Sequence, residues 1–185
     1  MNFNMGCGFN KREGYINIDK FSECSPDLQM DLEKFPWSID SNQADEVLFN
    51  HCLEHLGQET DVFLEIIKEV YRISKNNSKV LINVPHPRHD HYLGDPTHVR
   101  VITPLVLSLF SKKENLIWQK NNNSNTPLGI YLNVDFELIE TLQVLDPYYQ
   151  DKFNKNELTV DDLNRYLHER NNVVEEYQFV LKVLK

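Results

Sequence analysis

The middle of the chain contains a short strand candidate, an amphipathic helix and a second strand candidate in direct succession. Apolar side chains recur at three- and four-residue spacing over residues 62–73, which predicts a helix capped by Thr60 and stopped by Asn76-Asn77-Ser78. Residues 46–49 and 79–84 form apolar runs that are too short for helices and favour strands. Two strands joined through a helix by short turns form a right-handed crossover, so this pattern predicts a parallel sheet.

Turn residues separate further apolar stretches, which lie at residues 3–5, 15–18, 28–30, 131–145 and 177–184. An asparagine-rich loop at residues 121–127 divides the first three of these stretches from the last two. The chain has 185 residues, of which 41% are hydrophobic and 25% are charged, and this is ordinary for one domain with one core. We therefore expect residues 1–185 to form a single α/β domain.

The net charge and the cysteine pattern indicate which partners and which cellular compartment to expect. Nineteen Lys and Arg residues against twenty-eight Asp and Glu residues give a net charge of −9, which would repel nucleic acid and anionic membranes. No apolar stretch approaches the roughly 20 residues of a membrane span, and the first four residues do not resemble a signal peptide. Cys7, Cys24 and Cys52 form no C-x-x-C pair. We expect a cytoplasmic protein with reduced thiols and with neither nucleic acid nor membrane as a partner.

Polar or flexible residues follow four of the strand candidates. A Gly6-Cys7-Gly8 turn follows the first strand, Asp19 ends the second, Asp31 follows the third, and Asn50-His51 ends the fourth. Glycine allows a ligand to approach the main chain closely, and a carboxylate can accept hydrogen bonds from ribose hydroxyls. Ligands of open parallel sheets collect at the carboxyl ends of the strands, so these residues are expected to line one site.

The order and spacing of these segments resemble the class I S-adenosylmethionine-dependent methyltransferases. More narrowly, they are similar to a compact bacterial and phage subgroup, of the methyltransferase type 11 kind with a shortened N-terminal region. The resemblance covers about residues 3–104 and is carried by Met5-Gly6-Cys7-Gly8, Gly14-Tyr15-Ile16-Asn17-Ile18-Asp19, Asp31-Leu32 and Leu53-Glu54-His55-Leu56. Residues 105–185 match only in outline.

The resemblance implies a Rossmann-like fold. We expect a mostly parallel central sheet with helices on both faces, a C-terminal antiparallel strand pair, and N-terminal helices that are missing or reduced. Six residues, 9–14, stand in place of the usual first crossover helix, and Asn10 stands near the place of a third glycine. Both departures are shared by the narrow subgroup.

The cofactor implied is S-adenosylmethionine, with S-adenosylhomocysteine as its product. By position, the two glycines of the turn would approach the methionine part of the cofactor, Asp19 would hold the ribose and Asp31 would meet the adenine. Asn50 and His51 would line the sulfonium end. The cofactor-binding set expected from the resemblance is Gly6, Cys7, Gly8, Asp19, Asp31, Leu32, Asn50 and His51.

Residues 85–104 hold four of the seven histidines, in a loop that leaves the carboxyl end of a central strand. Histidine is suited to take a proton near neutral pH, and we expect His98 or His86 to be the base, with Asp95 as a further catalytic residue. Arginines of the loop could hold an anionic or sugar-like acceptor. The substrate-binding residues expected here are Arg88, His89, His91, Tyr92, Arg100 and His55. The acceptor favoured is a small molecule or glycan with a hydroxyl group.

Two other functions stay open at this point. The chain could bind the cofactor without transferring a methyl group, as a module whose site is completed by a second copy or a partner subunit. The loop between His86 and His98 could instead hold a metal of a hydrolase, because imidazole and carboxylate are good ligands. We assign no metal site, because no helix places two of these histidines at a spacing of four residues.

Several polar residues also have a purely structural interpretation. Cys7 is expected to be a small buried residue rather than a nucleophile. Glu54 and His55 either lie near the cofactor or cap and orient the helix that follows them. The pairs Asp161-Asp162 and Glu175-Glu176 are expected on solvated faces of the C-terminal elements.

Overall fold

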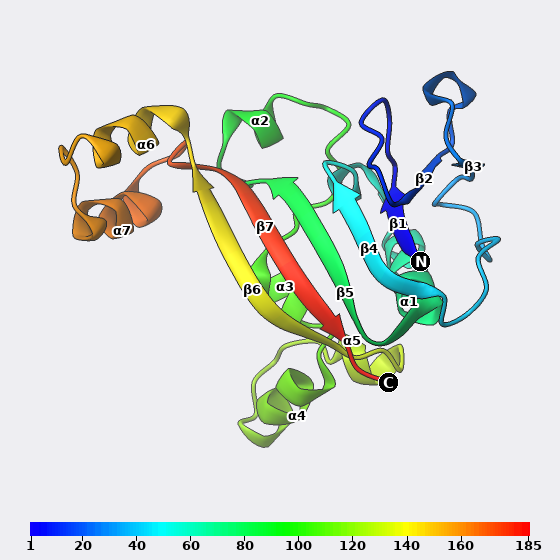
Figure 1. The fold of residues 1–185 in the computed structure, drawn as a ribbon. Helices are drawn as coiled ribbons and strands as arrows, with labels where there is room; N and C mark the ends of the chain where they lie inside the picture. Colours follow the sequence, from blue (N-terminus) through cyan, green and yellow to red (C-terminus); the bar gives the residue numbers. More distant parts are fainter.

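The computed structural model describes residues 1–185 and is built around one seven-stranded sheet (Figure 1). The strand order is β3-β2-β1-β4-β5-β7-β6. Strands β1 to β5 are parallel to one another, whereas β7 runs antiparallel to both β5 and β6. The strands are β1 Asn2–Met5, β2 Ile16–Asp19, β3 Leu28–Gln29, β4 Ala44–Asn50, β5 Ser74–Pro85, β6 Phe136–Leu145 and β7 Val174–Val183. The predicted parallel sheet and its C-terminal antiparallel pair are confirmed.

Seven α-helices and two 3-10 turns connect these strands. Helix α1 joins β4 to β5, α2 to α5 lie between β5 and β6, and α6 and α7 lie between β6 and β7 (Figure 1). The helices are α1 Thr60–Ile73, α2 Asp90–Leu93, α3 Pro104–Ser108, α4 Lys112–Lys120, α5 Leu128–Tyr131, α6 Pro147–Asn154 and α7 Val160–Glu169, and the 3-10 turns are η1 Ser22–Cys24 and η2 Leu53–His55. No helix is long and apolar enough to cross a membrane.

Helix α1 forms over the predicted residues, with small corrections at both ends. Glu59 rather than Thr60 is the N-cap residue, and its side chain makes no capping hydrogen bond. The helix ends at Ile73, and β5 begins at the next residue because Ser74 already pairs with Ala44 of β4. Asn76-Asn77-Ser78 therefore lies within β5 and does not stop the helix. Asn77 has a φ of 64°, at a place where the pairing of β5 with β4 is irregular.

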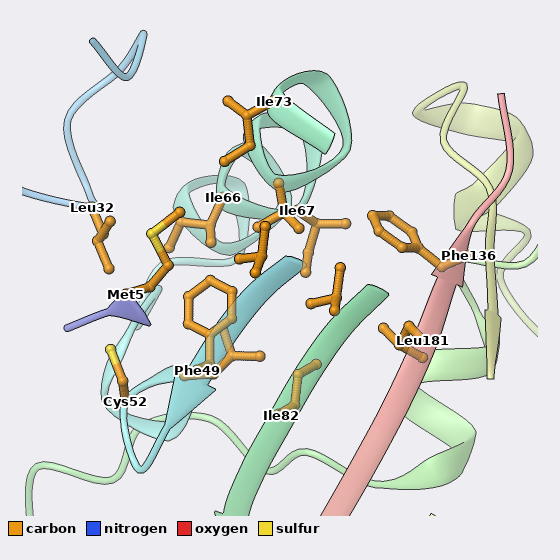
Figure 2. Close-up of a cluster of buried hydrophobic side chains, with 14 of the residues drawn as sticks. Met5, Leu32, Phe49, Cys52, Ile66, Ile67, Ile73, Ile82, Phe136 and Leu181 are labelled. Carbon is orange, nitrogen blue, oxygen red and sulfur yellow. The ribbon is translucent and has the colours of Figure 1, made fainter. Parts of the chain in front are cut away.

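The apolar face of α1 packs against one face of the sheet and builds the main core (Figure 2). Ile66 and Ile73 of the helix are fully buried, together with Phe49 of β4 and Ile82 of β5. Burial of each such side chain contributes about 1.5–3 kcal/mol. Met5 belongs to the same cluster and is fully buried, so the strand that leads into the glycine turn is fixed by the core.

Helices cover only one face of the central strands, which differs from the expected cover on both faces. Figure 1 shows α1 and α3 on one side of β4, β5 and β7 and no helix on the other side. On the open face Leu81 and Val180 are half-buried, and a hollow of about 220 Å3 lies between them and Arg12. The reason is local, because β1 and β2 are joined by a loop and only η1 lies between β2 and β3. The reduced N-terminal helices that the sequence predicts are thus confirmed.

The order in which strands are added to the sheet changes side at β1: β2 and β3 lie on one side of it, and β4 and β5 lie on the other. Phe3 of β1 pairs with Ile16 of β2 on one side and with Val47 of β4 on the other. Such a switch point opens a crevice beyond the carboxyl ends of the strands. The residues after Met5, Asp19 and Asn50 therefore meet at one edge of the sheet.

Candidate functional site

Two adjoining cavities lie at the carboxyl ends of the parallel strands. The first, here called the glycine cavity, has a volume of about 410 Å3 and includes Gly6, Asp19 and Asp31 in its wall. The second, here called the histidine cavity, has a volume of about 330 Å3, and its wall is made of histidine and glutamate side chains together with Pro85. His51 and His55 line both cavities, so the two form one continuous site.

The glycine turn is shaped so that no side chain fits at Gly6. This residue has a φ of +62°, and a Cβ atom built on it would overlap Sγ of Cys52. Gly8 also has a positive φ, of +49°, but a Cβ atom there would meet nothing within 4 Å. At position 6, both the positive φ and the lack of room for a Cβ atom require glycine, whereas at position 8 only the positive φ favours it.

Asp19 ends β2 with its carboxylate at the floor of the glycine cavity. Its Oδ2 accepts the N–H of Gly8 at 2.8 Å and its Oδ1 accepts the N–H of Phe21 at 3.0 Å. The residue is 8% exposed. Each carboxylate oxygen can accept a second hydrogen bond, so the pair of backbone donors orients the group and leaves acceptor capacity for a ligand.

The wall of the glycine cavity also combines a second carboxylate with apolar side chains. Asp31 follows β3 and accepts the N–H of Glu33 at 3.1 Å through Oδ1. Phe21, Met30 and Leu32 line the same cavity. Apolar side chains beside one carboxylate suit an aromatic ring that carries a hydrogen-bond donor at its edge.

Three of the residues predicted to bind the cofactor do not line this cavity. The Cys7 side chain is buried, and burial raises the pKa of its thiol, which fits the expected small buried residue. Gly8 contributes through its N–H bond to Asp19. Asn50 points elsewhere, because its Oδ1 accepts the side-chain N–H of Asn83 at 2.8 Å. The other five predicted residues, Gly6, Asp19, Asp31, Leu32 and His51, do line it.

His51 stands where the two cavities meet and carries a positive charge. Its Nε2 is 2.7 Å from Oε2 of Glu176, and its Nδ1 is 3.7 Å from Oε1 of Glu54. The hydrogen bond to Glu176, supported by Glu54, raises the pKa of His51 to about 10. The same contact lowers the pKa of Glu176. His51 is therefore an imidazolium at neutral pH.

The sequence predicted that Glu175 and Glu176 lie on a solvated face, and this prediction is wrong. Both line the histidine cavity, and the side chain of Glu176 is only 17% exposed. Strand β7 pairs with β5 so that Glu176 lies opposite Pro85, at the strand end where residues 85–104, here called the histidine loop, begin. The sequence carried no signal for this, because the contact joins segments that are about ninety residues apart.

His55 and His98 both line the histidine cavity, and the hydrogen bonds of each ring show which nitrogen keeps a lone pair. His98 Nδ1 lies 2.9 Å from the carbonyl oxygen of Tyr92, which can only accept, so Nδ1 carries the hydrogen and Nε2 has a lone pair. His55 Nδ1 lies 2.9 Å from Oγ1 of Thr97, whose hydroxyl donates to Asp95 at 2.6 Å. The threonine oxygen therefore accepts from Nδ1–H of His55, and Nε2 of His55 is free in the same way.

Glu54 is the functional candidate that the sequence interpretation left undecided. Its side chain is 1% exposed, lines the histidine cavity, and has no hydrogen-bond partner at either oxygen. The backbone carbonyl of Glu54 accepts the N–H groups of Val99 at 2.9 Å and Arg100 at 3.0 Å. This contact fastens η2 to the end of the histidine loop and brings Glu54 and His55 beside His98.

His86 and His89 are buried outside the cavity wall. Nδ1 of His86 accepts the N–H of Arg88 at 3.1 Å, so its remaining nitrogen carries a hydrogen, and burial lowers the pKa of His86 to about 4. His89 uses both nitrogens, accepting the N–H of His91 at 3.0 Å and contacting Asp146 at 3.3 Å. Neither ring has a free lone pair, so the structure does not support His86 as the base or His89 as a substrate contact.

The remaining residues of the predicted acceptor site divide between the cavity and its support. His91 lines the histidine cavity, whereas Tyr92 stacks on His98 with ring centroids 5.2 Å apart. Asp95 does not line the cavity; it caps the turn at Thr97, and its Oδ2 lies 3.9 Å from Nε2 of His98. Neither arginine reaches the cavity: Arg88 donates to the carbonyl of His168 at 3.3 Å, and Arg100 lies over the ring of Phe63 and donates to the carbonyl of Gly57.

Comparison with solved structures identifies the architecture. A SAM-dependent methyltransferase from Archaeoglobus fulgidus aligns over 98% of this chain and 85% of its own, with a TM-score of 0.64 and 18% identity. An S-adenosylmethionine-dependent methyltransferase from Mesorhizobium loti aligns over 98% of this chain and 90% of its own, with a TM-score of 0.52 and 12% identity. The chain has the class I methyltransferase fold. The narrow subgroup suggested by the sequence stays a prediction.

A third structure holds ligands. The 1,6-didemethyltoxoflavin-N1-methyltransferase of Burkholderia thailandensis, solved with 1,6-didemethyltoxoflavin and S-adenosylhomocysteine bound, covers 100% of this chain and 71% of its own, with a TM-score of 0.53 and 10% identity. No protein-family model and no curated protein sequence matches the chain. The likeness to class I methyltransferases is thus one of fold.

Proposed function

We propose that this protein transfers a methyl group from S-adenosylmethionine to a hydroxyl group of a small polar acceptor. The observation that carries the proposal is the meeting of the Gly6 turn, Asp19 and Asp31 around one cavity at the switch point of a methyltransferase fold. A second, mainly polar cavity adjoins the first at His51 and His55. The first cavity would hold the cofactor and the second the acceptor.

The residues of the glycine cavity fit S-adenosylmethionine part by part. The side-chain-free Gly6 leaves room for the methionine portion against the main chain. Asp19 keeps acceptor capacity for the two ribose hydroxyls after binding two backbone N–H groups. Asp31 lies beside Met30 and Leu32, which matches an adenine ring with its exocyclic amine. The wall thus offers one group for each part of the cofactor.

When bound, S-adenosylmethionine supplies a methyl group whose bond to sulfur breaks, with the electron pair passing to sulfur, as an acceptor lone pair forms the new bond. The chain must place that lone pair in line and remove the proton of a hydroxyl. His55 and His98 line the histidine cavity and each keep a lone pair on Nε2, and His98, unlike His55, does not also line the glycine cavity. We assign His98 as the proton acceptor, in agreement with the sequence prediction.

The wall of the histidine cavity favours a neutral, hydroxyl-rich acceptor. Glu54, Glu175 and Glu176 contribute three carboxylates, and His51 contributes one imidazolium bound to Glu176. These groups can accept and donate hydrogen bonds to sugar-like hydroxyls, whereas an apolar acceptor would leave them unpaired. Arg88 and Arg100 do not reach the cavity, so we no longer assign them to an anionic acceptor.

Turnover on two matched panels tests the acceptor class. Purified protein is incubated with S-adenosylmethionine and either polyols and sugars or primary and secondary amines, and formation of S-adenosylhomocysteine is measured. The proposal predicts product with hydroxyl acceptors and none with amines. Turnover of amines alone would contradict the hydroxyl assignment. Cofactor binding without turnover of any acceptor would favour a binding module that needs a partner subunit.

We infer that the protein is cytoplasmic and that neither nucleic acid nor membrane is among its partners. The three cysteines are all free thiols, which fits a reducing compartment. The formal net charge of −9 is unfavourable for nucleic acid and anionic membranes. A second copy or another subunit could complete the histidine cavity, which is half open to solvent at His51.

A further inference from the structure

Three potential ligand atoms converge in the histidine cavity. One ligand atom from each of Glu54, His55 and His98 lies within 4.8 Å of the other two. Two imidazoles and one carboxylate form a donor set that binds first-row transition ions, with further positions left open for small ligands. We propose that Glu54, His55 and His98 form a binding site for a divalent transition-metal ion.

The hydrogen bonds of both imidazoles prepare them for coordination. His98 donates Nδ1–H to the carbonyl of Tyr92, and His55 donates Nδ1–H to Thr97, which in turn donates to Asp95. Metal-binding histidines in proteins commonly donate their second N–H to a carbonyl or carboxylate, which fixes the ring and leaves the other nitrogen as the ligand. Both Nε2 atoms meet this condition before any ion is bound.

The carboxylate of Glu54 supplies the independent reason to expect a ligand. It is 1% exposed, and neither of its oxygens has a hydrogen-bond partner. His51 is the nearest cation, and its Nδ1 lies 3.7 Å from Oε1, beyond hydrogen-bond distance. A buried carboxylate that accepts no hydrogen bond and has a single cation at 3.7 Å is only partly compensated for its lost hydration. An ion held by Glu54 would provide that compensation.

A second cluster in the same region is excluded by its hydrogen bonds. His89, His91 and Glu175 also bring ligand atoms within 4.8 Å of one another. However, His89 accepts a backbone N–H at Nδ1 and contacts Asp146 at Nε2, so it has no lone pair to give. The second cluster therefore keeps only two ligands, and one of them, His91, is exposed. The cluster of Glu54, His55 and His98 keeps all three and is the better site.

The consequence for catalysis rests on the proposed function. An ion at this site would bind the acceptor hydroxyl at an open position and lower its pKa, so that the O–H bond breaks and the proton leaves to solvent. The oxygen lone pair is then available for the methyl group. His98 cannot give the same lone pair to a metal and to a proton, so in the metal-loaded protein the ion replaces it as the activating group.

Metal binding to the protein alone tests the proposal. Protein stripped with a chelator is titrated with Zn2+ by calorimetry and with Co2+ by visible absorption, both without cofactor. We expect one equivalent of each ion and cobalt bands typical of nitrogen and oxygen ligands. Glu54→Gln and His98→Ala should each weaken Zn2+ binding by about a hundredfold or more, and Thr97→Val, which removes the support of His55, by about tenfold.

His91→Ala is the matched control, because it alters the same cavity and the rejected cluster but should leave Zn2+ affinity within about twofold. Unfolding curves of every variant show whether the fold is kept, and Glu54→Gln preserves the shape of the side chain. Absence of stoichiometric Zn2+ binding by the wild type at millimolar concentration overturns the proposal, as does unchanged affinity in Glu54→Gln. Cofactor titration of the same samples separates the two ideas: cofactor binding without metal binding refutes the metal site alone, and the reverse refutes the methyltransferase assignment alone.

Discussion

The two cavities are built by different means, although they share His51 and His55. The glycine cavity is formed by the ends of neighbouring parallel strands, and its key groups are a backbone turn, the carboxylate that ends β2 and a carboxylate two residues beyond β3. The histidine cavity is formed by side chains from η2, the histidine loop and β7. Its geometry depends on contacts between segments that are far apart in the sequence.

This difference suggests that the two cavities have separate tasks. The glycine cavity combines carboxylates with apolar walls, which suits a cofactor that is part ring and part polar chain. The histidine cavity concentrates four imidazoles and three carboxylates, which suits proton removal and recognition of a polar acceptor. Substitutions in one cavity should therefore spare the task of the other.

Replacing His98 should separate turnover from cofactor binding more strongly than any other substitution. His98→Ala should lower turnover by about 10²–10⁴-fold, because the free Nε2 that accepts the proton or binds the ion is lost. Cofactor affinity should change by less than about threefold, since His98 lines only the histidine cavity. Steady-state rates and calorimetric titration of the same sample measure both. A large loss of cofactor affinity would show that the two cavities are not separate.

Gly6→Ala should distort the glycine turn in the wall of the glycine cavity. The new methyl group would overlap Sγ of Cys52 at a positive φ, so we expect a loss of about 2–4 kcal/mol in the free energy of unfolding and loss of cofactor binding. Gly8→Ala is the control, because it has the positive φ without the overlap and should lose only about 1 kcal/mol. Denaturant unfolding measures both variants. Equal losses would contradict the role given to Cys52.

Asp19→Ala should weaken cofactor binding by roughly 1.5–3 kcal/mol, or about 10- to 150-fold, through the loss of hydrogen bonds to a charged group. The variant also removes acceptors from Gly8 and Phe21, so Asp19→Asn, which keeps the size of the side chain, serves as the second variant. Calorimetry gives the affinities. Unchanged affinity in both would mean that the carboxylate at the end of β2 does not face the ribose.

The sequence predicted the two cavities unequally well. Asp19 and Asp31 could be placed because Asp19 ends a strand and Asp31 comes shortly after one, and the carboxyl ends of parallel strands lie at the same edge of the sheet. The sequence named both His86 and His98 as the base and could not choose between them, because the choice depends on which ring nitrogen is already bonded. Glu176 was assigned to a solvated face, because its burial arises only when β7 pairs with β5.

The ion pair between His51 and Glu176 gives the smallest expected effect and a pH signature. His51 has a pKa raised from 6.5 to about 10, so its contribution to stability is complete below pH 6.5 and lost as pH rises through about 10. Glu176 has a pKa lowered from 4.5, so its contribution is complete above pH 4.5 and lost as pH falls. Both contributions are therefore complete between these limits.

Glu176→Gln should thus cost about 1 kcal/mol at pH 5.5, allowing for the exposure of His51, and almost nothing above pH 10. Urea unfolding of wild type and variant across this range measures the difference. A cost that does not vary with pH would indicate that packing, rather than the charge of His51, holds the border between the cavities.

Calorimetric titration with S-adenosylmethionine and S-adenosylhomocysteine tests the central claim most directly. The structure places Gly6, Asp19 and Asp31 around one cavity of about 410 Å3, and the account predicts that each compound binds there at one site per chain, competes with the other, and loses affinity in Asp19→Asn. No binding of either compound at millimolar concentration, or binding that is insensitive to substitution of Asp19, would contradict it.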